Sequence, residues 1–374
     1  MRVFWGCLFF FLLPVLVTGQ NFKPALHPDP YTPADTNALF LTIDNANFLK
    51  NNEFFNPYVE GYTKLGFFFN PRLTYLLSER TALSAGAHFL KYSGSDGFQD
   101  ITPVFSVEHR FNPRLRLVMG TLRNEHRHRL IDPIYHFENY LDQHVENGLQ
   151  FLVDHPLARG DIWINWEQFI LRGSDFRERF EAGISADFRL LESEQKLSLE
   201  APFQMLVQHK GGQINRSDKP VSTLYNMAAG LSLQLHTGSP LLSSLTFRNQ
   251  LVLFRDGSPQ KVQPYSRGRA LYSNLILTRK ALSLELSYWQ ARRFLSFSGN
   301  PIFQSYSLKK ANAMNPDREL IVGRLRYSRK YQHLTFLVNA DTYWDPRNHS
   351  TDFGFGIYLL LNTQLILTNK IESR

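Results

Sequence analysis

The most constraining feature of this chain is a two-residue alternation of apolar and polar side chains along one long segment, 221–236. One face collects Val221, Thr223, Tyr225, Met227, Ala229, Leu231, Leu233 and Leu235. The other face is small or polar, with Leu224 as the exception. Because a helix repeats about every 3.6 residues and would scramble this pattern, the segment is predicted to be a β-strand. Its length suits a tilted strand that crosses a membrane.

Similar alternation recurs at 177–189, 196–208, 244–253 and 281–294. Alternation alone also fits a soluble sandwich, but long strands, connections that alternate between short and long, and aromatic residues at the ends of the apolar faces favour a membrane barrel. Those aromatic residues are Trp163, Trp166, Tyr288, Trp289, Tyr343 and Trp344. The predicted fold is all-β: a transmembrane antiparallel up-and-down β-barrel of about 16 strands (roughly 14 to 18), with both ends in the periplasm.

The start of the chain predicts export. Arg2 precedes the apolar run 3–17 and the small pair Thr18-Gly19, so residues 1–19 are predicted to be a cleaved signal peptide. Four prolines in 20–36 predict an extended periplasmic arm, and the barrel is expected to occupy 37–374. Cys7 is the only cysteine, so the mature chain is expected to have no disulfide or thiolate chemistry.

One polar insert, 123–147, interrupts the alternation and is predicted to be the most elaborate outer loop. In a porin such a loop folds into the lumen, where its mixed charges create a field across a constriction. The residues predicted for this constriction and its wall are Arg127, Arg129, Asp132, Glu138, Arg110, Arg116, Arg324 and Arg326. His126 and His128 are weak metal candidates, but the three arginines interleaved in this segment repel a cation, so no metal site is predicted.

Three stretches resemble the outer-membrane β-barrels of Bacteroidota, a porin-like family of poorly assigned function: 47–66, 124–151 and 354–369. The chain departs from many barrels by ending in Ile-Glu-Ser-Arg and not in an aromatic residue. The resemblance implies a barrel and an outer-membrane address, and it implies no catalytic residue.

The predicted function is passive uptake of small hydrophilic solutes through a porin-like channel. Two alternatives stay open: a lumen plugged by its own salt bridges, and a non-conducting subunit of an outer-membrane complex that exports or assembles surface proteins. The chain lacks the G-x-S-x-G and H-E-x-x-H motifs, so it is predicted not to be an enzyme and to need no cofactor. With a net charge of +8, the expected partners are anionic outer-membrane lipid and lipopolysaccharide, small polar solutes and outer-membrane or periplasmic proteins, but no nucleic acid.

Overall fold

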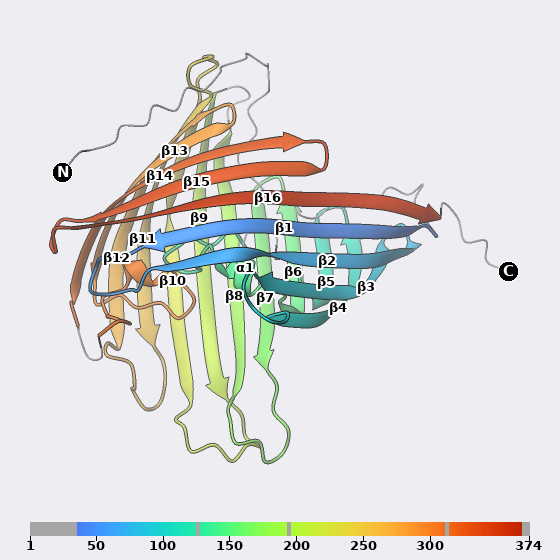
Figure 1. Ribbon diagram of the computed structural model, residues 1–374, viewed down its shortest axis with the longest axis horizontal. Helices are drawn as coiled ribbons and strands as arrows, with labels where there is room; N and C mark the ends of the chain where they lie inside the picture. Colours follow the sequence, from blue (N-terminus) through green and yellow to red (C-terminus); the bar gives the residue numbers. More distant parts are fainter. Residues whose placement is uncertain (1–35, 125–127, 193–195, 311–313, 369–374) are drawn as a thin grey trace.

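The computed structural model describes residues 36–124, 128–192, 196–310 and 314–368, whose strands form one closed antiparallel barrel (Figure 1). The strands are β1 (Leu39–Glu53), β2 (Tyr62–Ser78), β3 (Thr81–Tyr92), β4 (Asp100–Asn112), β5 (Leu115–Thr121), β6 (Asn147–His155), β7 (Ala158–Gln168), β8 (Glu178–Glu192), β9 (Leu197–Gly211), β10 (Ser222–His236), β11 (Ser244–Asp256), β12 (Arg267–Arg279), β13 (Leu282–Arg292), β14 (Asp317–Tyr331), β15 (Leu334–Asp345) and β16 (Ser350–Thr368). The predicted barrel of 16 strands is therefore confirmed. The predicted signal peptide, 1–19, and the arm up to residue 35 lie outside the described residues.

Each strand pairs with its neighbours in sequence, and the first strand closes the barrel on the last. The β1–β16 register runs from Leu39 opposite Thr368 to Glu53 opposite Phe353. Closure leaves no strand edge with unpaired backbone groups, which is the condition for crossing a lipid bilayer with strands. Among the described residues, no helix is long and apolar enough to span a bilayer.

The connections divide the barrel into two unlike ends. The connections after β2, β4, β6, β12 and β14 are two-residue turns, and the remaining turns at that end are also short. The connections after β5 and β13 are the longest and occupy 122–146 and 293–316. Short turns face the periplasm and long loops face outward in bacterial barrels, so this pattern orients the chain.

The outward face carries the apolar side chains, as the alternation predicts. In β10, Leu231 is 51% exposed and Leu233 is 40% exposed, whereas the neighbouring Ala228 is only 1% exposed. Exposed leucine, isoleucine and phenylalanine side chains recur on the same outward phase of the other strands. Such an exterior is stable against lipid and not against water.

The interior corrects one sequence expectation. Three of the aromatic residues assigned to the ends of the outward face, Trp163, Trp289 and Tyr343, point inward and are buried. Trp166 and Trp344 remain exposed on the outside. The physical reason is an apolar core inside the barrel, which the alternation of the strands alone does not reveal.

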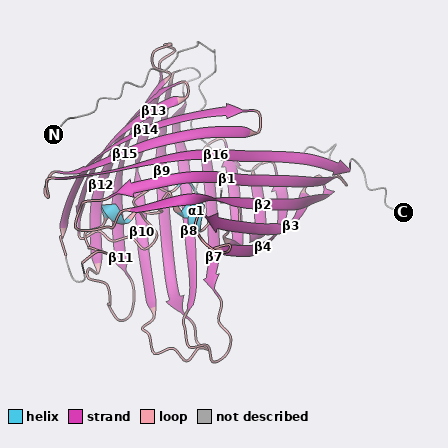
Figure 2. Ribbon diagram, in the orientation of Figure 1, coloured by secondary structure: helices cyan, strands magenta, loops and turns pink. Residues whose placement is uncertain are grey.

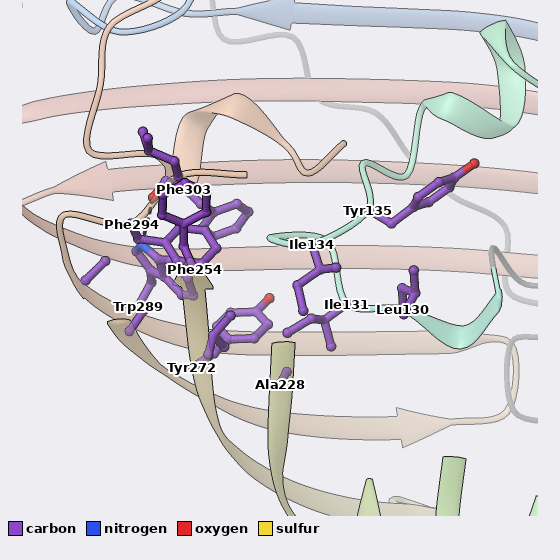
Figure 3. Close-up of a cluster of buried hydrophobic side chains, with 14 of the residues drawn as sticks. Leu130, Ile131, Ile134, Tyr135, Ala228, Phe254, Tyr272, Trp289, Phe294 and Phe303 are labelled. Atoms are coloured by element: carbon purple, nitrogen blue, oxygen red, sulfur yellow. Dashed lines mark hydrogen bonds between the residues drawn. The ribbon is translucent and has the colours of Figure 1, made fainter. Parts of the chain in front are cut away.

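That core forms where long loops fold between the walls (Figure 3). The loop 122–146 contributes Ile131 and Ile134, and the loop 293–316 contributes Phe294 and Phe303. They pack with inward side chains of the wall, such as Trp289. The short helices of the two loops, α1 (Asn139–Asp142) and the 3-10 turn η3 (Pro301–Phe303), are drawn among the strands in Figure 2.

Candidate functional site: a filled lumen and the Glu138 cluster

The loops 122–146 and 293–316, here called the first and second inward loops, bind to each other and to the wall. Between the loops, the Asn300 backbone N–H donates to the Asp132 carbonyl at 2.9 Å and the His136 N–H donates to the Ser298 carbonyl at 2.7 Å. Towards the wall, the Ile131 N–H donates to Gln204 of β9 at 3.0 Å. Buried backbone groups that find partners in this way hold a loop in one place.

A buried ionic cluster fastens the first inward loop to β14. The Arg324 guanidinium is hydrogen-bonded to the Asp132 carboxylate, and it also lies 3.7 Å from Glu285 and 3.6 Å from Asp341. The side chains of Arg324 and Asp132 are each 2% exposed. Burial raises the pKa of Asp132, but Arg324, His136 and the hydrogen bonds from Phe137 and Asn300 together outweigh burial, so this pKa lies below its usual value. Asp132 is therefore ionised at neutral pH.

A second polar cluster lies where α1 meets the outer ends of β1, β2 and β3. We call it the Glu138 cluster, and its members are Asn52, Tyr62, Lys64, Tyr92, His136, Glu138 and Asp142.

The Glu138 carboxylate is the centre of this cluster. Asn52 donates its amide N–H to Oε1 at 2.8 Å, and the Tyr62 hydroxyl donates to Oε2 at 2.7 Å. The Lys64 ammonium lies 3.4 Å from Oε2, and His136 Nε2 lies 3.7 Å from Oε1. Lys64 also pairs with Asp142, which accepts a hydrogen bond from Tyr92.

The electrostatics give Glu138 and His136 different protonation states. Burial raises the pKa of Glu138, but the basic side chains around it, His136 first and then Lys64 and Lys50, bring this pKa below its usual value. Burial also lowers the pKa of His136, and the nearby carboxylates do not fully compensate. At neutral pH the cluster therefore holds an ionised carboxylate beside a neutral imidazole, which are the states that a base and its orienting acid need.

This cluster also reaches solvent, unlike the Arg324 cluster. The side chains of Lys64 and Asp142 are 21% and 30% exposed, whereas that of Arg324 is 2% exposed. The ammonium of Lys64 and the amide of Asn52 are donors that can bind a developing oxyanion. A general base, oxyanion donors and access are the parts that ester hydrolysis requires.

His128, one of the two weak metal candidates, has both ring nitrogens in use. Nδ1 lies 2.8 Å from Asp161, Nε2 is paired with Glu146, and the ring stacks on Trp163 at 3.8 Å. Burial lowers the pKa of His128, but the two carboxylates outweigh burial and raise it to about 10. An imidazolium held in this way has no lone pair for a metal. The described residues contain no group of three or more His, Cys, Asp or Glu side chains that could hold one.

The other predicted constriction residues are spread over several places. Arg129 lies 3.4 Å from Asp187, and Arg116 lies 3.1 Å from Glu108 near the periplasmic end. Arg326 lies 3.7 Å from Glu285, beside the Arg324 cluster. Arg110 is opposite Arg116 in the β4–β5 register, while Arg127 and His126 lie outside the described residues. The structure thus brings together Asp132, Arg324 and Arg326, and leaves Glu138 in a separate cluster.

A comparison with protein families finds a match that covers most of the chain. The family described as Lipid A 3'-O-deacylase-type matches residues 31–370. The chain belongs to this family. Membership corrects the sequence expectation that the protein is not an enzyme, because the family is named for an enzyme. The absence of G-x-S-x-G and H-E-x-x-H could not exclude an enzyme, because catalytic groups assembled from separate strands have no fixed spacing.

Solved structures agree on the fold. OccAB4 of Acinetobacter baumannii matches with a TM-score of 0.51 and 9% identity over 89% of this chain and 100% of that one. The outer membrane protein OpdK of Pseudomonas aeruginosa matches with a TM-score of 0.50 and 9% identity over 88% of this chain and 100% of that one. Identities this low show a shared barrel architecture and no more. No curated protein matches the chain.

Sequence reasoning missed most of the Glu138 cluster. It singled out Glu138 but not Asn52, Tyr62 or Lys64, which come from β1 and β2. One signal was present: all three have even numbers, and the even positions of β1 and of the first half of β2 face inward. The sequence could not show that Glu138, at the start of α1, contacts these three residues.

Proposed function

We propose that this protein is an outer-membrane enzyme that hydrolyses an ester-linked acyl chain of lipid A, with the Glu138 cluster as its reaction centre. The family match over residues 31–370 is the observation that carries the proposal. The position of the cluster supports it. Asn52 lies at the outer end of β1 and Tyr62 begins β2, so the cluster lies near the level of the outer leaflet, where lipid A resides.

In this proposal His136 is the general base. Its neutral imidazole takes a proton from a water molecule, and that water attacks the ester carbonyl. The Glu138 carboxylate orients the ring and stabilises the imidazolium that forms. The Lys64 ammonium and the Asn52 amide stabilise the oxyanion of the tetrahedral intermediate. The tetrahedral intermediate then breaks its bond to the sugar oxygen, which takes the proton from the imidazolium and leaves as a hydroxyl, so the products are a free fatty acid and a deacylated lipid.

The test is a kinetic comparison of single variants purified in detergent, with lipid A as substrate and released fatty acid as the readout. His136→Gln and Glu138→Gln are each expected to lower kcat by about 100-fold or more, the usual size of a general-base contribution. His333→Gln is the matched control, because His333 is exposed at the periplasmic turn between β14 and β15. Equal activity of all three variants would refute the assignment of the site.

The pH profile gives an independent readout. Because the pKa of His136 lies below its usual value, activity is expected to stay constant from neutral pH into the mildly acidic range before it falls. An acid limb at or above the ordinary histidine pKa of about 6.5 would contradict the proposed base.

A passive channel is the second candidate function, favoured by the charged residues on the inner wall and by the shared fold with the outer membrane protein OpdK. The filled interior argues against it, since the two inward loops place buried side chains such as Ile134 and Phe303 between the walls. Liposome swelling with sugars of increasing size separates the two candidates. Swelling at the rate of a porin would favour the channel, and no swelling would favour the enzyme.

A further inference from the structure

A patch of arginines lies on the outside of the barrel at its outer end. Arg267 begins β12, Arg292 ends β13, and Arg255 lies one residue before the end of β11. In the register, Arg255 is opposite Arg267, and Arg269 is opposite Arg292. Four basic side chains from three adjacent strands therefore meet at one level of the wall. We call them the rim arginines.

The rim arginines point towards the lipid and not into the lumen. Arg269 is exposed, and its neighbour Ala270 is 3% exposed. On β13, Arg292 is exposed, and its neighbours Ala291 and Trp289 are 4% and 0% exposed respectively. This alternation fixes the direction of the side chains, because successive residues of a strand face opposite sides of the sheet.

The positive charge of this patch is mostly uncompensated. Among the described residues, Arg255, Arg267 and Arg269 form no ion pair, whereas Arg292 lies 3.9 Å from Asp317. The nearby Arg347 lies 3.4 Å from Glu319. A charge at the lipid boundary without a protein partner is costly unless an anion from the membrane neutralises it.

An open pocket of about 440 Å³ joins the arginines to the apolar wall. Its lining includes three arginines and one carboxylate towards the rim (Arg269, Arg292, Arg347 and Asp317), and Leu251 and Leu271 towards the middle of the bilayer. Leu251 and Leu271 are opposite each other in the β11–β12 register, and both are exposed. The pocket thus offers guanidinium groups above an apolar surface, which fits a phosphate group above acyl chains.

We infer that this pocket binds the phosphate group of a bisphosphorylated glycolipid in the outer leaflet, with its acyl chains along Leu251 and Leu271. The site is separate from the Glu138 cluster, because β14, β15 and β16 lie between β13, which carries Arg292, and β1, which carries Asn52. It goes beyond the proposed function: it would hold a lipid at the outer wall, not at the reaction centre. The apolar floor selects a membrane lipid over a free phosphate ion.

Native mass spectrometry of the full-length mature protein in mild detergent tests this inference. The probe is bisphosphorylated lipid A, and the comparison probe is the same lipid without its phosphate groups. Arg269→Gln/Arg292→Gln is expected to weaken binding of the phosphorylated probe by about 30-fold, since each basic residue near an anionic surface is worth about 1 kcal/mol. The dephosphorylated probe is expected to bind weakly to both proteins.

The matched control is Arg279→Gln/Arg329→Gln. Arg279 lies on the same outward phase of β12 but at the periplasmic end, and Arg329 lies towards the periplasmic end of β14, so the charge change is the same. This variant is expected to bind the phosphorylated probe as the unaltered protein does. An equal loss of binding in both variants, or equal binding of the two probes, would overturn the inference. So would displacement of the phosphorylated probe by inorganic phosphate alone.

The readout is binding, so this result stands apart from the proposed enzyme activity. If Arg269→Gln/Arg292→Gln loses binding of the phosphorylated probe but hydrolyses lipid A at an unchanged rate, the result supports a separate lipid site. Hydrolysis by the unaltered protein together with equal probe binding by all variants overturns the rim site and leaves the proposed function in place.

Discussion

Replacing Arg324 by methionine tests how firmly the first inward loop is held. Arg324 is surrounded by the carboxylates of Asp132, Glu285 and Asp341, and its own side chain is 2% exposed. The substitution keeps an unbranched apolar stem in place of the arginine stem but removes the cation from these carboxylates. Breaking a buried ion pair by removing one partner costs about 3 to 5 kcal/mol. We expect a loss of this size in the free energy of unfolding.

The assay is urea unfolding of the barrel in lipid vesicles, followed by tryptophan fluorescence. Arg326→Met is the matched control: Arg326 lies on the same strand, is 23% exposed and makes one ion pair, at 3.7 Å. A partly exposed ion pair of this kind contributes less than about 1 kcal/mol to the free energy of unfolding. If Arg324→Met and Arg326→Met lowered the free energy of unfolding equally, the argument that the buried cluster fastens the loop would be refuted.

Removing both partners of the pair gives a sharper form of this prediction. Asp132→Asn takes away the carboxylate that hydrogen-bonds to Arg324, and it preserves the approximate shape of the side chain. In the double variant neither charge is left without its partner, so its loss of stability is expected to be smaller than the sum of the two single losses. Strict additivity would mean that the two groups do not interact.

Three further predictions concern the first inward loop and the wall behind it. Since the pKa of His128 is about 10 in the fold and about 6.5 in the unfolded chain, its stabilising effect is complete below pH 6.5 and is lost as pH rises through about 10, a dependence that the unfolding free energy of His128→Gln should lack. His144 has the opposite sign: burial and its neighbours His88 and Arg72 lower its pKa to about 3, so stability is complete above pH 6.5 and falls as the pH drops towards about 3, and His144→Phe should flatten this acid limb in the same unfolding assay. Gly183→Val should lower the free energy of unfolding in urea by about 1 to 3 kcal/mol, because a Cβ atom at Gly183 would lie 2.2 Å from the ring of Trp163. A urea midpoint equal to that of the unaltered protein would show that the ring moves aside at no cost.

The architecture could be predicted from the sequence because a lipid-facing wall imposes a simple rule on each strand. In β10 the odd positions face outward, and the one exception on the other face, Leu224, is 6% exposed inside the barrel. Leu224 belongs to the core that the inward loops complete, so the exception was a sign of that core. A single strand cannot show which distant loop will cover its inner face.

A repeated pentapeptide shows the limit of local sequence. Phe-Asn-Pro-Arg-Leu occurs at 69–73 inside β2 and again at 111–115, where it forms the turn between β4 and β5. In the second copy the Asn112 side chain accepts a hydrogen bond from the Arg114 N–H at 2.8 Å. In the first copy, pairing with β1 and β3 on both sides extends the same residues. Tertiary pairing, not composition, decides between the two conformations.

The candidate site was harder to predict than the fold for the same reason. Its acceptor, Glu138, comes from a loop, and its donors Asn52, Tyr62 and Lys64 come from strands more than seventy residues away in sequence. The charges in the loop are visible in the sequence, but their partners depend on where the loop enters the barrel. The constriction hypothesis expected these charges to create a field across the lumen; in the structure Asp132 and Glu138 are buried and paired.

The most direct test of this account is the lipid A of a Gram-negative host that produces the protein in its outer membrane. Lipid A extracted from these cells and measured by mass spectrometry is expected to contain a species that has lost one ester-linked acyl chain, and cells that produce the Glu138→Gln variant at the same level are expected to lack this species. Lipid A of unchanged mass in cells whose barrel is correctly assembled would contradict the account.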